Sequence, residues 1–563
     1  MITYLDTPHK RLEELLEATD PTPNAVGRDA LVSPSGCVVH LDAKARPRLM
    51  WYGEDLLEVE MPAGTRVVYP KPTIAGLRDR DAAIRYAIEH PEGMEPLESL
   101  LKPGMKVTVA IDDISLPLPP MKRPDVRESV LTVVLGLLAV NCVDDVHIIV
   151  ATSLHRRMTP AEVRHAVGPR IFRAYYPGRL YNHDGEAPGG MVELGVTECG
   201  EHVRLNRRAA ESDLLIYVNI NLVPMDGGSK SVGVGLCDYS ALQAHHTPQT
   251  ILKCDSYFDH TRSEMGRSCD RIGKVINDHL KVFHIETVLN NAMFDPRMAF
   301  FMKNEDRHSI YDRMMFNATR HTLSNLPRQL KRKVLFAIPA YYQMIAVHAG
   351  ATLPTHAKTL AYCYSQYCVP VEQQSDVVVY GIPFVSPYNV NSVLNPLLVQ
   401  VMALGYFHNM YRGMPVVKKN GVLIITHPLY DEFDHHHHPS YIDFFNRLLP
   451  ETRDSIELQQ KYEAEFAHDP SYIRMYRTGH AYHGVHPFYM WYWGENGRAH
   501  TGKVIVVGAE SKRAAGLMGW ETAINMNEAL AMAESHVGRK PSVTLMHFAP
   551  ILMADVNGTP QSI

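Results

Sequence analysis

The sequence predicts an α/β protein with two domains, each built on a largely parallel sheet flanked by helices. Short apolar runs alternate with helix-like segments along most of the chain, which is typical of parallel strands joined by helical crossovers. The 563 residues are too many for a single hydrophobic core, so at least two domains are expected. With 45% hydrophobic and 21% charged residues, the composition is that of an ordinary globular protein.

The first half of the chain contains three strand-like runs, residues 106–111 (KVTVAI), 146–151 (VHIIVA) and 213–223 (DLLIYVNINLV). Residues 129–143 predict a buried helix that leads into the second of these strands. Thr159 begins a capping box with proline at the first helical position, which predicts a helix after that strand. These elements belong to the first predicted domain, residues 1–330.

A second series of strands predicts the second domain, residues 331–544. Its strands are expected at residues 333–338, 376–380, 421–426, 503–507 and 542–548, with an amphipathic helix at residues 522–536. Residues 247–332 are expected to form mostly helices and connections. The end of the chain, residues 545–563, is a candidate to return and complete the first domain.

Three chemically active side chains stand just past predicted strands, namely Asp113, His155 and Lys230. In parallel sheets, ligand sites form beyond the carboxyl ends of the strands. We therefore expect these three side chains to share one site, in the cleft between the two domains.

Charge and apolar patterning exclude several function classes. The formal net charge of −5 and the absence of a basic stripe argue against nucleic-acid binding. The longest apolar stretch, residues 129–143, is too short to span a membrane, and the first residues carry no apolar leader. The eight cysteines form no CxxC pair, which favours reduced thiols and a cytoplasmic protein.

The segment 226–230 (DGGSK) and the pair His245-His246 are the strongest local signals. Glycines allow a backbone to approach a cofactor closely, and a lysine on such a loop can reach it. The first glycine of a phosphate-binding loop is absent, so the segment is not a nucleotide P-loop. An ordinary turn is the alternative interpretation.

Several segments together resemble the nickel-dependent lactate racemase family of hydroxyacid racemases and epimerases. They cover roughly residues 40–550, most closely in the first half, and they occur in the same order as in the family. Residues 111–117 resemble its Asp-Asp-x-Thr-Arg-Pro segment, and residues 151–159 resemble its Gly-x-x-x-His-Arg-x-Met-Thr segment. Residues 182–184 and 194–197 resemble its Asn-His-Asp and Leu-Gly-x-Thr pieces. Residues 227–230, followed by Gly235 and by His245-His246, resemble its Ser-Gly-Gly-x-Lys loop and the Asn-His that follows it.

The resemblance implies a nickel-pincer nucleotide, a pyridinium-3-thioamide-5-thiocarboxylate mononucleotide whose ring carbon and two sulfurs hold Ni. Lys230 matches the lysine that forms the thioamide, and His246 matches the fourth nickel ligand, which suits square-planar nickel. Asp113, Gly228 and Ser229 are further expected cofactor contacts. The family's reaction is a hydride shuttle, and His155 matches one of its acid/base histidines, a residue type whose pKa suits proton transfer. Proteins that synthesise the cofactor are expected partners, and a homo-oligomer is allowed.

The chain departs from the family pattern at three places. Met225 stands where the resemblance expects a second acid/base histidine, so Asp226 or His245 would have to replace it. Leu116 stands where the family has an arginine that suits a carboxylate. Residues 394–398 (LNPLL) stand where the family has a Tyr-Gln-x-x-Lys pattern, so a second cationic group is missing as well. We infer an altered substrate, bulkier or less charged than lactate.

The expected activity is racemisation or epimerisation of a 2-hydroxy acid or a related hydroxy compound. One alternative is a one-way oxidoreductase with the same cofactor, because only one base is evident. Another is a non-catalytic protein that binds the cofactor or a sugar acid. Trp491 and Trp493 are candidates for an aromatic wall or for core packing, and residues 435–438 (HHHH) are expected to form a solvated loop.

Overall fold

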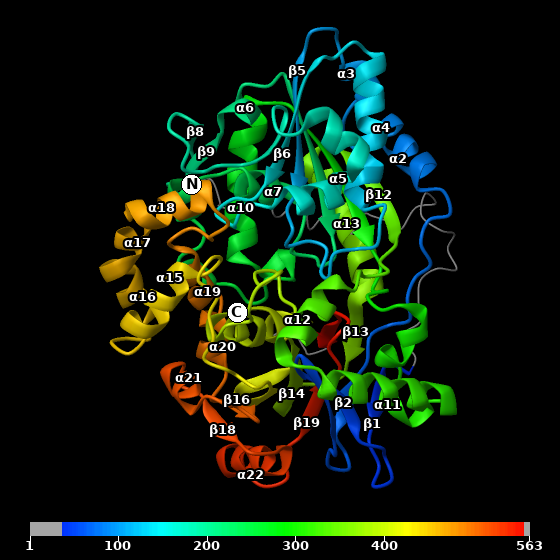
Figure 1. Cartoon of the computed structure of the whole chain (residues 1–563), viewed down its shortest axis with the longest axis vertical. Coiled ribbons are helices and arrows are strands. Elements are labelled where there is room, and N and C mark those ends of the chain that lie inside the picture. Colours follow the sequence, from blue (N-terminus) through cyan, green and yellow to red (C-terminus); the bar gives the residue numbers. More distant parts are fainter. Residues whose placement is uncertain (1–35, 557–563) are drawn as a thin grey trace, which may run out of the picture.

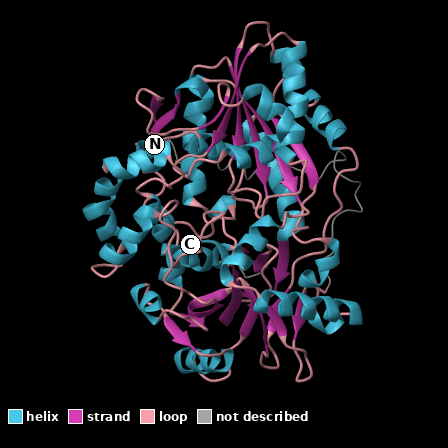
Figure 2. Ribbon diagram, in the orientation of Figure 1, coloured by secondary structure: helices cyan, strands magenta, loops and turns pink. Residues whose placement is uncertain are grey.

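The computed structural model describes residues 36–556 (Figure 1). Two large sheets lie at opposite ends of the molecule, with helices around them and between them (Figure 2). Within each sheet most neighbouring strands are parallel, so the predicted α/β class is confirmed. Two small sheets, of three strands and of two strands, complete the described part of the chain.

The first sheet has six strands in the order β12-β11-β10-β5-β6-β7, and only β12 is antiparallel to its neighbour. Its strands are β5 (Lys106–Asp112), β6 (Asp145–Ala151), β7 (Leu180–Asn182), β10 (Leu214–Asn221), β11 (Val282–Leu289) and β12 (Met344–Gly350). Every residue of β10 and β11 is buried, as expected for central strands covered on both faces.

Helices α4 (Val126–Val140) and α5 (Pro160–Tyr175) belong to this sheet's crossovers, and Thr159 forms the predicted capping box of α5. The other helices between residues 80 and 279 are α2 (Arg80–Glu89), α3 (Leu97–Leu100), α6 (Arg207–Ala210), α7 (Gly228–Gly235), α8 (Tyr239–Leu242), α9 (Pro248–Leu252) and α10 (Glu264–His279). A two-stranded hairpin, β8 (Met191–Val196) with β9 (His202–Asn206), lies beside them.

The second sheet has nine strands along the order β1-β4-β19-β14-β16-β17-β18, with β2 and β3 attached through β14. Its strands are β1 (Val38–His40), β2 (Arg48–Gly53), β3 (Asp55–Val59), β4 (Arg66–Val68), β14 (Ser375–Pro383), β16 (Val417–Thr426), β17 (Lys503–Val507), β18 (Glu521–Ala523) and β19 (Val543–Met546). The three-stranded sheet consists of β13 (Cys368–Val371), β20 (Met553–Val556) and β15 (Tyr411–Gly413).

The strand pairing does not divide the chain at one point. The early strands β1 to β4 pair into the second sheet, whereas β12, beyond residue 330, pairs with β11 in the first. The two sheets therefore do not coincide with the predicted domains, residues 1–330 and 331–544. These domain bounds stay a prediction. The tail to residue 556 enters the three-stranded sheet, and residues 557–563 lie outside the described part.

One predicted strand is wrong. Residues 333–338 lie mostly within helix α12 (Arg328–Ala337), which follows helix α11 (Ile310–Asn325). Lys331 and Arg332 of α12 form ion pairs with Asp55 and Glu54, so contacts with the early strands hold this segment as a helix. The strand β11, in the region expected to be helical, was not predicted either.

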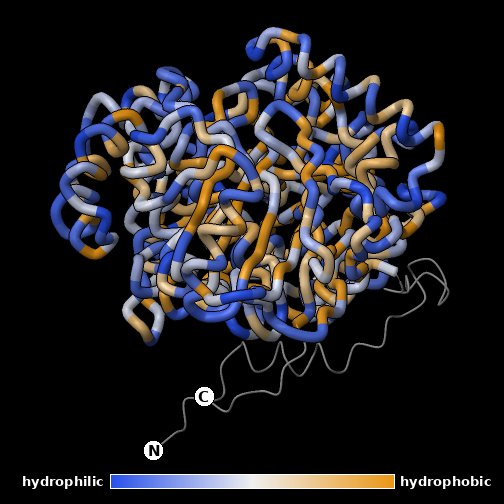
Figure 3. The backbone as a smooth tube through the Cα atoms, turned by 90° about the horizontal axis from the view of Figure 1, so that it is seen from below, coloured by the Kyte–Doolittle hydropathy of each residue, from blue (hydrophilic) through white to orange (hydrophobic). Residues whose placement is uncertain are grey.

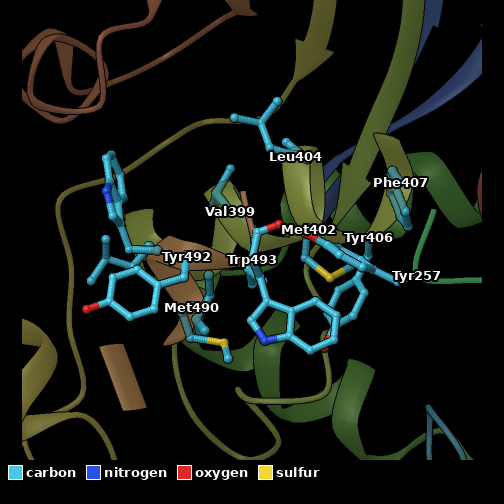
Figure 4. Packing of buried hydrophobic residues seen from close by; sticks show 14 of the residues in the cluster. Tyr257, Val399, Met402, Leu404, Tyr406, Phe407, Met490, Tyr492 and Trp493 are labelled. Atoms are coloured by element: carbon cyan, nitrogen blue, oxygen red, sulfur yellow. Dashed lines mark hydrogen bonds between the residues drawn. The ribbon is translucent and has the colours of Figure 1, made fainter. Parts of the chain in front are cut away.

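Apolar segments run through the interior, and polar segments dominate the outer loops (Figure 3). The largest buried cluster lies between the two sheets and contains Trp491, Trp493 and many tyrosines. Figure 4 shows Trp493 packed near Tyr257 and Tyr406, with ring centroids 4.5 Å and 5.6 Å away. In the described residues, every helix is too short or too polar to cross a membrane.

The second half carries the helices that surround this cluster. They include α13 (Thr352–Tyr367), α14 (Pro396–Gln400), α15 (Pro439–Asp443), α16 (Ser455–Leu458), α17 (Ala464–His468), α18 (Pro470–Thr478), α19 (His486–Tyr492), α20 (Glu495–His500), α21 (Lys512–Leu517) and α22 (Met526–Val537). Helix α19 lies between the two sheets in Figure 1. Every residue of α19 is buried, which makes it part of the core that joins the two halves.

Candidate active site

The side chains predicted at strand ends meet at one edge of the first sheet. Asp113 follows β5, His155 follows β6, and Lys230 lies on α7 after β10. These three strands are neighbours and run parallel, so their carboxyl ends lie side by side. The three residues thus lie at neighbouring strand ends, and their roles in one functional site stay a prediction.

His155 and Asp113 form a hydrogen-bonded pair. The Nδ1 atom of His155 lies 2.8 Å from a carboxylate oxygen of Asp113, and the backbone N–H of Ser115 donates to the other oxygen at 2.9 Å. Burial raises the pKa of Asp113, but the pairing with His155 and the hydrogen bonds from Ser115 outweigh it and hold the pKa below its ordinary value. An ionised carboxylate accepts only, so it keeps the proton of neutral His155 on Nδ1 and leaves a lone pair on Nε2.

The two glycines of the predicted loop fit closely against the protein itself. Gly227 and Gly228 have φ of +89° and +60°, conformations that favour glycine. A Cβ atom on Gly227 would lie 2.4 Å from Oδ1 of Asn221, and one on Gly228 would lie 2.7 Å from the ring of His356. The N–H of Gly228 donates to Glu286 at 2.7 Å.

Gly228 and Ser229 are buried against this inner framework rather than beside the cavity described below. Ser229 is 4% exposed and packs against Gly273 of α10. The glycines therefore allow α7 to begin directly over Glu286 and His356, which fixes the position of Lys230. Direct cofactor contact through Gly228 and Ser229 stays a prediction.

His245 and His246 follow α8 as a pair of buried imidazoles whose ring centroids are 4.8 Å apart. Neither ring nitrogen of His245, nor Nδ1 of His246, has a hydrogen-bond partner of ordinary geometry within the described chain. Burial lowers the pKa of His245 to about 4 and places that of His246 well below the ordinary value, with the charges of Lys230 and His155 adding to the second shift. Both rings are therefore neutral near pH 7 and keep a lone pair.

Asp226 is buried, and its carboxylate accepts hydrogen bonds from the backbone N–H groups of Leu222 and Val223 at 3.3 and 3.1 Å. Burial raises its pKa to about 6, although the nearby charge of Lys230 acts in the opposite direction. The carboxylate thus closes the turn that leads from β10 to α7.

A cavity of about 170 Å³ adjoins these residues. Its polar wall includes His155, Asp226 and Lys230, and its other walls are largely apolar. Leu116 and Met225, which stand at two of the three places that depart from the family pattern, both line it. Further lining residues come from the second half of the chain, among them Tyr388, Met402, Tyr406 and Phe548. The cavity therefore lies where segments of the two halves meet.

Trp493 stands near His246, with ring centroids 5.8 Å apart, and Tyr489 lies 5.3 Å from the same ring. Trp491 instead is fully buried in the core and donates its indole N–H to the carbonyl of Arg453. Both tryptophans belong to the buried core, so the structure shows packing roles for them, and an aromatic wall beside the substrate stays a prediction for Trp493.

The four-histidine run is only partly a solvated loop. His435 and His436 are exposed, whereas His438 is fully buried and its ring nitrogens contact Ser392 and the carbonyl of Tyr388. The expectation of a solvated loop is therefore wrong for His438. Its burial depends on contacts with residues far away in the sequence, which the run of identical letters does not reveal.

Three residues near the site were not predicted, namely Glu286, His356 and His486. Glu286 accepts from Gly228 and pairs with His356, whose Nδ1 is 3.0 Å away. The signal for Glu286 was present, because a carboxylate stands within a largely apolar run at residues 282–289. His486 begins α19, and its following proline marks the first helical turn.

Glu463 links α8 to α19 and provides a test of this packing. It is 1% exposed, and it accepts hydrogen bonds from the hydroxyls of Tyr239 and Tyr492 at 3.1 and 2.8 Å. Burial raises its pKa to about 7, the two tyrosine hydrogen bonds acting in the opposite direction. A raised folded-state pKa gives stability that is complete below the ordinary value and is lost as the pH rises through about 7.

The free energy of unfolding of Glu463→Gln is therefore expected to change less between pH 5 and pH 8 than that of the wild type. At pH 8 it is expected to exceed the wild-type value by on the order of 2 kcal/mol. Urea unfolding followed by tryptophan fluorescence measures this, because Trp491 and Trp493 lie on or beside α19. Tyr492→Phe serves as the control that keeps the carboxylate. An unchanged pH dependence in Glu463→Gln would contradict the argument.

Comparisons with known proteins point to one family. The lactate racemase N-terminal domain matches residues 52–256. Over 174 residues the chain is 25% identical to a lactate racemase of Lactiplantibacillus plantarum, and over 177 residues it is 23% identical to one of Thermoanaerobacterium thermosaccharolyticum. Each alignment covers 30% of this chain and 38% of the relative, so the matched part spans about two fifths of the relatives' length.

The fold comparison extends over nearly the whole chain. The lactate racemase apoprotein of Thermoanaerobacterium thermosaccharolyticum superposes with a TM-score of 0.57 and 16% identity, covering 91% of this chain and 100% of that structure. The fold is therefore shared, at a sequence distance that leaves the two sites free to differ. The chain is thus similar in sequence to the N-terminal domain of lactate racemases and shares the fold of one of them.

Proposed function

We propose that the protein is a racemase or epimerase of a 2-hydroxy acid or related hydroxy compound, with a nickel-pincer nucleotide as its cofactor. The observation that carries this proposal is that His155, hydrogen-bonded to Asp113, lines the same cavity as Lys230. An oriented imidazole beside a lysine amine supplies proton transfer next to an attachment point. The racemase relatives support this choice over a binding role.

The donor set fits a cofactor that brings most of its own nickel ligands. Among residues 36–556, no group of three or more His, Cys, Asp and Glu side chains is placed to hold a metal alone. His246 instead offers one buried neutral imidazole with an unpartnered Nδ1. Lys230 would tether the nucleotide, and His246 would complete the nickel coordination.

When bound, this cofactor would supply the hydride acceptor for the carbinol carbon. His155 would take the hydroxyl proton through its free Nε2, because Asp113 holds the proton on Nδ1. The apolar walls would keep water from the reacting carbon. Proteins that make the cofactor would be required partners in the cell.

The test is to purify the chain after expression together with the cofactor-synthesis proteins and to incubate it with one enantiomer of 3-phenyllactate, a 2-hydroxy acid with an apolar group. Appearance of the other enantiomer on chiral chromatography is the expected result. A one-way oxidoreductase would give only the 2-keto acid. A binding protein would give neither product.

Leu116 provides a prediction about substrate choice. Its side chain lines the cavity at the position where the resemblance expects an arginine. Leu116→Arg is expected to raise kcat/KM for lactate relative to 3-phenyllactate by about 10-fold or more, because a guanidinium binds a carboxylate that an apolar wall does not. Leu116→Met is the control for altered packing. An unchanged ratio in the arginine variant would show that the substrate carboxylate lies elsewhere.

A further inference from the structure

The proposed reaction needs two proton-transfer groups, one for each enantiomer, and the cavity wall shows only one placed imidazole. Met225 lines the cavity at the position of the second histidine in the resemblance, and a thioether carries no proton to exchange. Of the two replacements expected from the sequence, His245 is fully buried and is not part of the cavity wall, whereas Asp226 lines the cavity with one carboxylate oxygen bound to two amides of its own turn. The imidazole that lies beside His155 instead comes from helix α19.

Helix α19, in the second half of the chain, brings another histidine next to His155, behind the residues that line the cavity. His486, Tyr489 and Trp493 are spaced three and four residues apart, so they share one helix face. The ring of His486 lies 5.4 Å from that of His155, while Tyr489 and Trp493 lie 5.3 and 5.8 Å from His246. This face therefore spans the space between the proposed base and the proposed nickel ligand.

His486 is built into its position with one nitrogen left free. Its side chain is 3% exposed, and its Nδ1 is 2.5 Å from the hydroxyl of Tyr441. Within residues 36–556, its Nε2 has no hydrogen-bond partner. Its ring also lies 5.0 Å from that of Tyr388, which lines the cavity together with His155.

The partner of each histidine suits a different task. The Asp113 carboxylate only accepts, so neutral His155 keeps its proton on Nδ1. The Tyr441 hydroxyl can either donate to or accept from Nδ1 of His486. With Nδ1–H donating to the Tyr441 oxygen, His486 presents a lone pair at Nε2 when neutral and an N–H there when protonated, which a group that takes a proton in one direction and returns it in the other requires.

We propose that His486 is the second acid/base residue of the site and that it exchanges a proton with the substrate hydroxyl of the enantiomer that His155 does not serve. This inference rests on the proposed function. The protons balance when one imidazole starts neutral and the other protonated: the neutral ring gains the hydroxyl proton as the alcohol becomes the ketone, and the protonated ring returns its proton when the alcohol forms again. When bound, the nickel-pincer nucleotide named above would supply the hydride acceptor.

The first test needs neither cofactor nor substrate. Diethyl pyrocarbonate acylates neutral imidazoles that it can reach, and peptide mass spectrometry locates the label on the full apo chain. We expect labelling of His155 and His486, and none of His438, whose two ring nitrogens are hydrogen-bonded in the same cluster. If His486 remained unlabelled when His155 was fully labelled, the proposal would be overturned.

The second test separates the two enantiomers. The holoprotein and its His486→Gln and His155→Gln variants are mixed with L- or D-3-phenyllactate, and the 2-keto acid formed in a single turnover is measured. Each variant is expected to lose at least about 10²-fold in rate with one enantiomer, and the two variants with opposite ones. His438→Gln, a matched change in the same aromatic cluster, is expected to keep both rates.

The outcomes distinguish the two proposals. Equal slowing of both enantiomers in His486→Gln, at unchanged nickel content, would mean that His486 only supports the packing, and would overturn this inference. If the wild-type holoprotein oxidises neither enantiomer, the proposed function fails for this substrate. The labelling result then decides whether His486 faces the cavity.

Discussion

Lys230→Ala is expected to purify without nickel and without a covalent mass increment, even when the cofactor-synthesis proteins are present. Lys230 is the lysine of the cavity wall, and the tight seating of Gly227 and Gly228 on Asn221, Glu286 and His356 fixes the start of its helix. Loss of a covalent tether removes the positioned hydride acceptor, so turnover is expected to fall by at least about 10³-fold.

Two further variants make this result specific. Lys230→Arg keeps the positive charge, but a guanidinium remains protonated and cannot form the covalent link. The same loss of nickel and of the mass increment is therefore expected. Lys253→Ala removes an exposed lysine at the end of α9, and it is expected to keep about one equivalent of nickel. Intact mass and metal analysis measure all three. An unchanged increment in Lys230→Ala would place the tether elsewhere.

The sequence predicted best where local pattern and burial coincide. The runs at residues 106–111, 146–151 and 503–507 became β5, β6 and β17 within one residue at each end, because central parallel strands are apolar throughout. The strand β11 was missed for the opposite reason. His284, Glu286 and Thr287 interrupt its pattern, although all three are buried against other polar groups.

Long-range pairing set the other limits. Residues 333–338 form a short apolar run like that of a strand, but they lie mostly in helix α12, whose Lys331 and Arg332 form ion pairs with Asp55 and Glu54. No local pattern near residues 38–68 predicts that this segment pairs with β14 and β19, which come hundreds of residues later. The sequence therefore could not place the division between the two sheets.

The candidate site shows the same contrast. Asp113, His155 and Lys230 were predictable because each follows its own strand, and the topology of a parallel sheet brings strand ends together. His486 was not, because its place beside His155 depends on how α19 packs between the halves. When distant segments contribute to one site, local motifs predict only the residues that each motif contains, and not the contacts between segments.

His155→Gln is expected to lower turnover by about 10²–10⁴-fold while leaving the nickel content and the mass increment unchanged. His155 lines the cavity with its side chain 27% exposed, so the substitution removes a proton acceptor without disturbing a packed core. Unchanged cofactor loading together with lost turnover would distinguish the role of His155 from that of Lys230. Metal analysis and chiral chromatography on the same preparation measure both quantities.

Asp113→Asn tests why His155 acts as a base. A carboxamide can donate to Nδ1 of His155, which moves the proton of the neutral ring to Nε2 and removes the lone pair that the substrate needs. We therefore expect a loss approaching that of His155→Gln, whereas Ser115→Ala keeps the backbone N–H bond to Asp113 and is expected to lose far less. If Asp113→Asn retained full turnover, the carboxylate would not set the tautomer, and His155 would act in another protonation state.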